Sequence, residues 1–95
     1  MIALQQYRTR PKIISDVLSS AGSSGEGLNI TGVMRKCNLS YSFAASLVGE
    51  LVGAGLMLEL KDDGGKRYGL SGKGSVYLEK YAQLREFVET YGLRL

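Results

Sequence analysis

The side chains that usually perform catalysis or bind metals are nearly absent from this chain. Its 95 residues contain no histidine and a single cysteine, Cys37. Histidine is the commonest general base and metal ligand, and one cysteine can close neither an intrachain disulfide nor a cysteine-based zinc site. Residues 72–74, glycine–lysine–glycine, lack the remaining positions of a phosphate-binding loop. We therefore expect no enzymatic activity, cofactor, metal or small-molecule substrate.

Basic side chains are the groups best suited to bind a partner. The formal net charge is +3 and the isoelectric point is about 9.1, which suits a polyanion. Residues 1–73 carry nine basic and six acidic side chains, whereas residues 74–95 carry three of each. The candidate phosphate contacts are Arg8, Arg10, Lys36, Lys66, Arg67 and Lys73. For Arg8 and Arg10 a solvated terminus is an equal alternative, and for Lys36 the alternative is the negative end of a helix dipole.

Apolar spacing and capping residues predict three helices in the first half of the chain. The first helix begins near Pro11, and residues 21–27 form a loop that Leu28 follows as a very short strand. Asn29 or Thr31 caps a second helix that ends near Cys37. A turn over residues 38–40 leads to a third helix from Tyr41 to about Ala54, whose predicted inner stripe is Ala44, Leu47, Val48 and Leu51. Close helix packing is the simpler explanation of Gly49 and Gly53, and a backbone that can approach another surface is the alternative.

A β-hairpin and a final helix follow. Two strand-like runs flank the aspartate- and glycine-rich residues 62–65, which favour a tight turn. Leu58, Leu60, Tyr68 and Leu70 are candidates for its buried face. Ser71 caps the last helix, which reaches Tyr91 before Gly92 stops it.

This order of elements predicts an α+β fold, a winged helix-turn-helix with a three-helix core and a β-hairpin wing. We divide the chain into a basic arm over residues 1–10, the winged domain over residues 11–74, and a dimerisation helix over residues 75–95. A signal peptide and a membrane-spanning run are both missing from the sequence, so we expect a cytoplasmic, nucleoid-associated protein without a membrane partner.

The last helix carries the spacing of a coiled-coil seam. Tyr77, Tyr81, Leu84, Val88 and Tyr91 step by four, three, four and three residues, and Phe87 widens the stripe. Packing on its own domain is the alternative for the first half of this stripe. Its far half extends beyond so small a domain, so the six residues predict a homodimer interface.

The chain resembles the small dimeric winged-helix DNA-binding proteins of archaea, which include ten-kilodalton chromatin proteins and predicted transcription regulators. The likeness rests on residues 38–41, on the apolar helix ending at Gly55-Leu56, and on residues 65–68 and 70–74. It implies a homodimer through an antiparallel coiled coil, with the third helix in the major groove of duplex DNA and Lys66 and Arg67 on the wing. The residues that the resemblance places against DNA are Ser40, Tyr41, Ser42, Ala45 and Ser46.

The sequence therefore predicts a double-stranded DNA-binding protein that acts as a transcription regulator or as a chromatin-associated architectural protein. The third helix has no lysine or arginine on its outer face, which predicts weak sequence specificity. Asp62 and Asp63 near the wing tip depart from the family and would repel phosphates. The alternative is a winged helix that contacts another protein and does not bind DNA.

Overall fold

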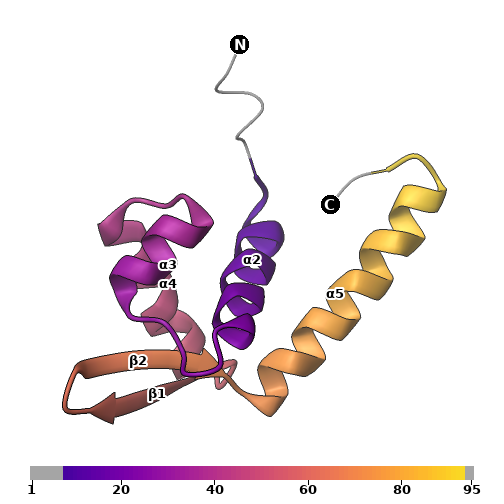
Figure 1. Ribbon diagram of the computed structural model, residues 1–95. Coiled ribbons are helices and arrows are strands. Elements are labelled where there is room, and N and C mark those ends of the chain that lie inside the picture. The colour runs from indigo at the N-terminus through magenta and orange to yellow at the C-terminus, as the bar shows by residue number, and fades with distance from the viewer. Residues whose placement is uncertain (1–7, 94–95) are drawn as a thin grey trace.

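The computed structural model describes residues 8–93 and places four helices and a two-stranded sheet in that part of the chain. Figure 1 shows the helices of the first half of the chain gathered above a β-hairpin, with the last helix leaning away from them. The elements in chain order are α2 (Arg10–Ser23), α3 (Ile30–Cys37), α4 (Tyr41–Gly53), β1 (Met57–Asp62), β2 (Gly65–Leu70) and α5 (Gly72–Thr90). This is the predicted winged helix-turn-helix order.

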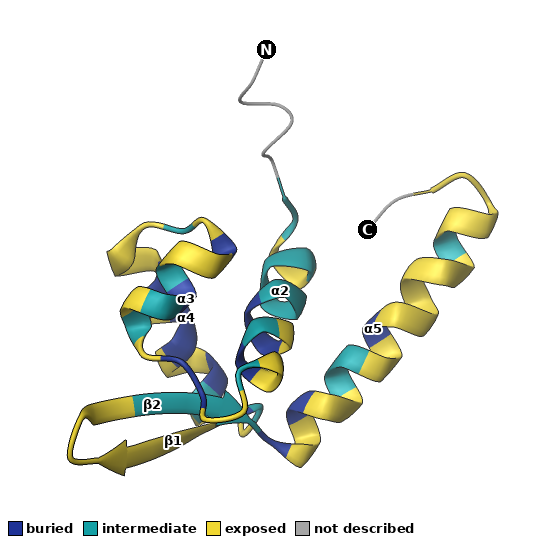
Figure 2. Cartoon of the chain, in the orientation of Figure 1, coloured by how far each residue is buried: buried dark blue, intermediate teal, exposed yellow. Residues whose placement is uncertain are grey.

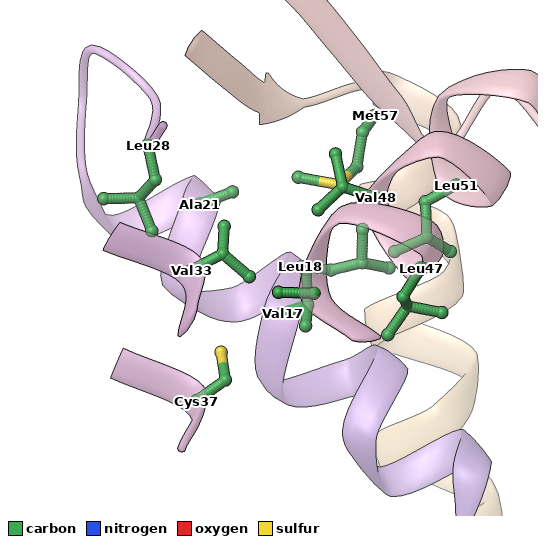
Figure 3. Close-up of a cluster of buried hydrophobic side chains, with 11 residues drawn as sticks. Val17, Leu18, Ala21, Leu28, Val33, Cys37, Leu47, Val48, Leu51 and Met57 are labelled. Carbon is green, nitrogen blue, oxygen red and sulfur yellow. The ribbon is translucent and has the colours of Figure 1, made fainter. Parts of the chain in front are cut away.

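Helices α2, α3 and α4 enclose the hydrophobic core. The stripe predicted for α4 is buried in full, and Leu47 at its centre is 1% exposed. Val17 and Leu18 of α2 and Val33 of α3 pack against it, as Figure 3 shows. Figure 2 shows the dark buried residues on the sides of the helices that face one another. The inner stripe predicted for the third helix is therefore confirmed.

Side-chain caps fix where the helices begin. Asn29 accepts a hydrogen bond from the backbone N–H of Gly32 at 2.8 Å, Ser40 from Phe43 at 3.2 Å, and Ser71 from Gly74 at 2.9 Å. Each bond satisfies one of the unpaired donors at a helix start. Of the two caps proposed for the second helix, Asn29 is the one that is used.

The loop predicted over residues 21–27 begins three residues later than expected. Helix α2 continues to Ser23 because Ala21 is buried in the core and Gly22 packs closely under β2. A Cβ atom on Gly22 would lie 2.9 Å from Cδ2 of Leu70. Here tertiary packing outweighs the loop-forming tendency of the glycine and serine residues.

The wing is an antiparallel hairpin with a two-residue turn, Asp63-Gly64. Asp62 pairs with Gly65 in the ladder, and its carboxylate accepts a hydrogen bond from the N–H of Gly64 at 2.8 Å. On the other side of β2, Leu28 forms the predicted single-residue strand by exchanging two backbone hydrogen bonds with Tyr68 at 2.9 and 2.8 Å. The sheet order is thus Leu28, β2, β1.

The predicted buried face of the wing is half wrong. Tyr68 and Leu70 are half-buried on the side of the core, but Leu58 is 51% and Leu60 43% exposed. Met57, which pairs with Leu70, is the buried residue of β1. Because side chains alternate across a strand, a one-residue shift moved both leucines to the outer face.

Helix α5 is held at its beginning by a close backbone contact. Gly74 is buried, and a Cβ atom there would lie 2.2 Å from the carbonyl oxygen of Leu56. The helix packs against α2 near its start and then diverges, so that its second half stands away from the core in Figure 1. In the part of the chain that is described, no helix combines the length and the apolar character needed to cross a membrane.

Candidate nucleic-acid interface

The turn between α3 and α4 positions the candidate recognition helix. Asn38 adopts a left-handed backbone conformation (φ 58°), which ends α3 and lets the N–H of Leu39 bond to the carbonyl of Met34 at 3.0 Å. Ser40 then caps α4, so its hydroxyl is already used within the fold. The three-residue turn expected in a helix-turn-helix is present.

The predicted contact residues of α4 lie on its solvent side. Tyr41 is 57% exposed, Ser42 and Ser46 are exposed, and Ala45 is half-buried. Further along the helix, Gly49 and Gly53 have no atom within 4 Å of where a Cβ would lie, so helix packing within residues 8–93 does not require them. Close packing, the simpler explanation of these two glycines, is therefore wrong within the protomer.

Two cations at the end of α3 have no side-chain partner within residues 8–93. Arg35 and Lys36 are exposed in the last turn of α3, just before the turn into α4. Neither makes an ion pair or side-chain hydrogen bond within residues 8–93, although both lie where they favour the negative end of the α3 dipole. Our prediction named Lys36 but omitted Arg35, which occupies the adjacent position and could have been included on the same grounds.

The described part of the predicted basic arm is bound to the fold. Arg8 forms an ion pair with Asp16 at 2.9 Å and donates hydrogen bonds to the carbonyls of Cys37 at 2.7 Å and Asn38 at 3.2 Å. Arg10 is the first residue of α2 and pairs with Glu50 on α4. Residues 1–7 of the arm lie outside the described residues. Arg8 thus satisfies carbonyls at the end of α3, and Arg10 neutralises an acid on the candidate recognition helix.

The remaining predicted cations also have partners within the chain. On the wing, Lys66 lies 3.6 Å from Glu59, and Arg67 lies 3.9 Å from Asp62. Residues 57–70 carry three basic and three acidic side chains, so the wing has no net charge. Lys73, in the first turn of α5, donates to the carbonyl of Ala54 at the end of α4 at 3.2 Å. That bond explains a cation at an otherwise unfavourable helix start.

The free thiol of Cys37 lies beside a polar groove. The groove encloses about 560 Å³ between α2 and the end of α3, and its lining includes Arg8, Asp16, Ser20 and Lys36. The Sγ of Cys37 lies 3.6 Å from the hydroxyl of Ser20, and burial raises the pKa of the thiol above its ordinary value. A buried thiol with a raised pKa is poorly reactive, which fits a packing residue.

The predicted dimer residues divide into two groups along α5. Tyr77 and Tyr81 stack near the start of the helix, with ring centroids 6.3 Å apart, and Tyr81 is only 8% exposed in the protomer. Burial, and secondarily Tyr81, raises the pKa of Tyr77, whose hydroxyl donates to the carbonyl of Pro11 at 3.2 Å. The first half of the stripe thus packs on its own domain.

The second half of the stripe is exposed. Leu84 is 49%, Phe87 59% and Tyr91 68% exposed, and Val88 is half-buried. Phe87 and Tyr91 pack edge to face on one another, with centroids 5.2 Å apart. An apolar groove of about 270 Å³ continues the stripe toward α2; it is lined by Pro11, Tyr77, Lys80, Tyr81 and Leu84.

Comparison with known proteins supports the fold assignment. The chain is similar in fold to Sso10a-2, a DNA-binding protein from Sulfolobus solfataricus, with a TM-score of 0.71 and 22% identity over 90% of each chain. It is also similar to a MarR family protein from Bacillus stearothermophilus, with a TM-score of 0.68 and 24% identity over 87% of this chain and 58% of that one. MepR, a transcription regulator of the Staphylococcus aureus multidrug efflux pump MepA, gives a TM-score of 0.72 and 16% identity over 95% and 67% of the two chains.

No curated protein sequence matches the chain. A family model described as winged helix-turn-helix matches residues 7–89, which are most of its length. The match covers the core, the wing and nearly all of α5, and the resemblance inferred from the sequence is confirmed by this match and by the likeness to the archaeal protein. The chain belongs to the winged helix-turn-helix family.

Proposed function

We propose that this chain binds double-stranded DNA, with α4 in the major groove, as a transcription regulator or chromatin-associated architectural protein. The observation that carries the proposal is the outward face of α4. Ser42, Ser46, Gly49 and Gly53 fall within an arc of roughly 60° at 3.6 residues per turn, directly opposite the buried stripe. A face of hydroxyls and bare backbone lets the helix approach the floor of a groove about 12 Å wide.

The free cations favour the same placement. Arg35 and Lys36 precede the turn into α4, where the preceding helix of a helix-turn-helix crosses the DNA backbone. The N-terminus of α4, with Tyr41 exposed beside it, adds the positive end of a helix dipole. We assign phosphate contacts to the two cations, with Tyr41 and Ser42 orienting the helix.

The proposal predicts weak discrimination between sequences. The outward face of α4 offers hydroxyl groups but no arginine, asparagine or glutamine that could form a bidentate contact with a base. Glu50 also lies on α4, and its pairing with Arg10 removes a charge that would repel phosphate.

The wing contributes less than its two basic residues suggest. Lys66 and Arg67 would have to exchange Glu59 and Asp62 for phosphates. Exposed ion pairs are worth about 0–1 kcal/mol, so the exchange costs little, but the acids that remain oppose the gain. We keep both residues as secondary contacts on the DNA backbone. Arg8 and Lys73 act in the proposal mainly by holding α3, α4 and α5 together.

We further propose that the protein is a homodimer through α5, as an antiparallel coiled coil. The exposed second half of the stripe supports this arrangement, because Leu84, Phe87 and Tyr91 have no cover within residues 8–93. The apolar groove beside Tyr77 offers a second copy a continuous surface. A dimer would present two α4 helices to one duplex, in the cytoplasm and on the nucleoid.

The test is the salt dependence of binding to a random-sequence duplex, measured by fluorescence anisotropy. Two to four phosphate contacts per protomer give about four to eight per dimer, so log affinity should fall with log salt at a slope of about −4 to −7. Raising salt from about 50 to 200 mM should then weaken binding by roughly 10² to 10⁴.

Matched variants locate the contacts. Arg35→Ala with Lys36→Ala removes up to four phosphate contacts per dimer and should flatten the slope by about 2–4 units, equally for different sequences. Arg85→Ala removes a charge from the polar side of α5 and should leave the slope unchanged. Absence of binding to any duplex at low salt would refute the proposal and favour a protein-contact module. If the slope of the double variant at Arg35 and Lys36 equals that of the wild type, DNA lies on another face.

A further inference from the structure

The wing has one unpartnered edge. Within residues 8–93, β2 is paired on one side with β1 and on the other with Leu28, whereas the outer side of β1 faces no strand. Such an edge presents unpaired N–H and C=O groups that can template pairing with another strand. What the edge can accept depends on which of its residues point outward.

The hydrogen bonds of Tyr68 identify those residues. Both backbone groups of Tyr68 bond to Leu28, so they point away from β1. Glu59 lies opposite Tyr68 and therefore forms a non-hydrogen-bonded pair, in which its own N–H and C=O point outward. By alternation the same holds for Lys61, and in the described chain neither residue's backbone groups bond to a group outside the β1–β2 ladder.

We propose that β1 pairs antiparallel with β1 of a second copy of this chain, about a two-fold axis at Leu60. This inference goes beyond the proposed function and requires neither DNA nor the α5 dimer. In three central registers the outward N–H and C=O groups of one strand meet those of the other. These registers pair Glu59 with the partner's Glu59, Lys61 with the partner's Lys61, or Glu59 with the partner's Lys61. The third forms two complementary ion pairs, whereas each of the others sets like charges opposite one another.

The side chains of the protomer favour this register. Lys61 lies directly opposite Lys66 in the hairpin, and no acidic side chain within residues 8–93 forms an ion pair with it. The partner's Glu59 would supply that charge. On the outer face, Leu60 would meet the partner's Leu60 in a non-hydrogen-bonded pair, where side chains approach most closely. Pairing would thus cover part of an apolar face that the protomer leaves exposed.

A lysine on an edge strand can also serve to prevent pairing. A strand protected by lysine alone would repel a second copy in every register. In β1 the alternation Glu59-Leu60-Lys61 repels in two registers and attracts in one. The wing has no net charge to oppose the approach of a second wing, so charge complementarity selects a copy of the same strand.

Disulfide trapping tests the register in the full chain without DNA, in a Cys37→Ser background whose fold is checked by circular dichroism. Leu60→Cys should cross-link on mild oxidation, since its Cα would lie about 4.5 Å from its counterpart. Asp62→Cys is the exposed control. Its counterpart would lie four residues along, about 13 Å away, and should not link. Linkage of Glu59→Cys or Lys61→Cys in place of Leu60→Cys would overturn the register, and equal linkage of Asp62→Cys would indicate collision only.

Charge reversal tests the ion pairs by sedimentation between about 10 µM and 1 mM, where weak specific contacts associate. Glu59→Lys or Lys61→Glu alone should weaken association through β1 by on the order of tenfold. The associating species are α5 dimers, or monomers if α5 does not pair. The double reversal restores opposite charges and should recover wild-type association. Single variants that associate like the wild type, or a double variant as weak as the singles, would refute the proposal. Neither result depends on DNA binding, so the two proposals fail separately.

Discussion

Replacing Gly74 with alanine should destabilise the protein more than any other glycine-to-alanine change within its helices. The new Cβ would lie 2.2 Å from the carbonyl oxygen of Leu56 and 2.7 Å from Cδ1 of Leu70. The leucine side chain can rotate, but the carbonyl is backbone, so the start of α5 must retreat by about 1 Å to reach an ordinary contact. That movement would strain the hydrogen bonds from Ser71 to the carbonyls of Gly55 (2.7 Å) and Leu56 (3.3 Å).

The magnitude follows from these contacts. Overpacking costs about 1–3 kcal/mol and each weakened hydrogen bond about 1 kcal/mol, while removing a helical glycine returns up to about 1 kcal/mol. With two weakened hydrogen bonds, a net loss of about 2–4 kcal/mol should lower Tm by about 10–30 °C in a domain of this size. Thermal melting by circular dichroism at fixed protein concentration measures it. Gly72→Ala, which meets open space two residues earlier, is the control. If the Gly74→Ala protein melts within a few degrees of wild type, the docking of α5 described here is wrong.

Two further changes separate folding from function. Gly49→Ala with Gly53→Ala should raise Tm by about 4–8 °C per kcal/mol gained, because both sites are open helical positions. The same change should weaken duplex binding measured by anisotropy. If the protein is stabilised and its binding is unchanged, the DNA lies on another face. Leu84→Lys with Val88→Lys should yield monomers by sedimentation equilibrium while the thermal transition of the winged domain persists. A wild-type chain that is monomeric at tens of micromolar would contradict the α5 dimer.

The sequence predicted those parts of the fold that depend on neighbouring residues. Ser40 and Asn29 cap helices through bonds to groups three residues away, and Gly55 ends α4 with a φ of +82° that favours glycine. The stripe around Leu47 follows from helical spacing alone. These features require no knowledge of what lies across the core, so they were predictable.

The errors concern features that depend on distant contacts. Leu58 and Leu60 have the alternation of a buried strand, but the packing of Met57 into the core set the opposite phase. Arg10 and Glu50 are forty residues apart, and no local pattern pairs them. The elements that carry the candidate contact residues were therefore predictable from the sequence. Which of their charges are paired was not, because ion pairing is a property of the folded surface.

The ion pairs also bear on why a dimer would be needed. With Arg8, Arg10, Lys66 and Arg67 paired to acids and Lys73 bonded to the carbonyl of Ala54, Arg35 and Lys36 are the cations near the turn into α4 that have no side-chain partner within residues 8–93. Two phosphate contacts give a slope of about −1.8, so one protomer gains little more than tenfold from a fourfold fall in salt. Two protomers on one duplex double the slope to about −3.6, and the same fall in salt then strengthens binding by about 150-fold. Because so few charges remain free, appreciable electrostatic affinity depends on both copies engaging together. Dissociating the α5 interface should therefore weaken DNA binding even when every residue of the winged domain is intact.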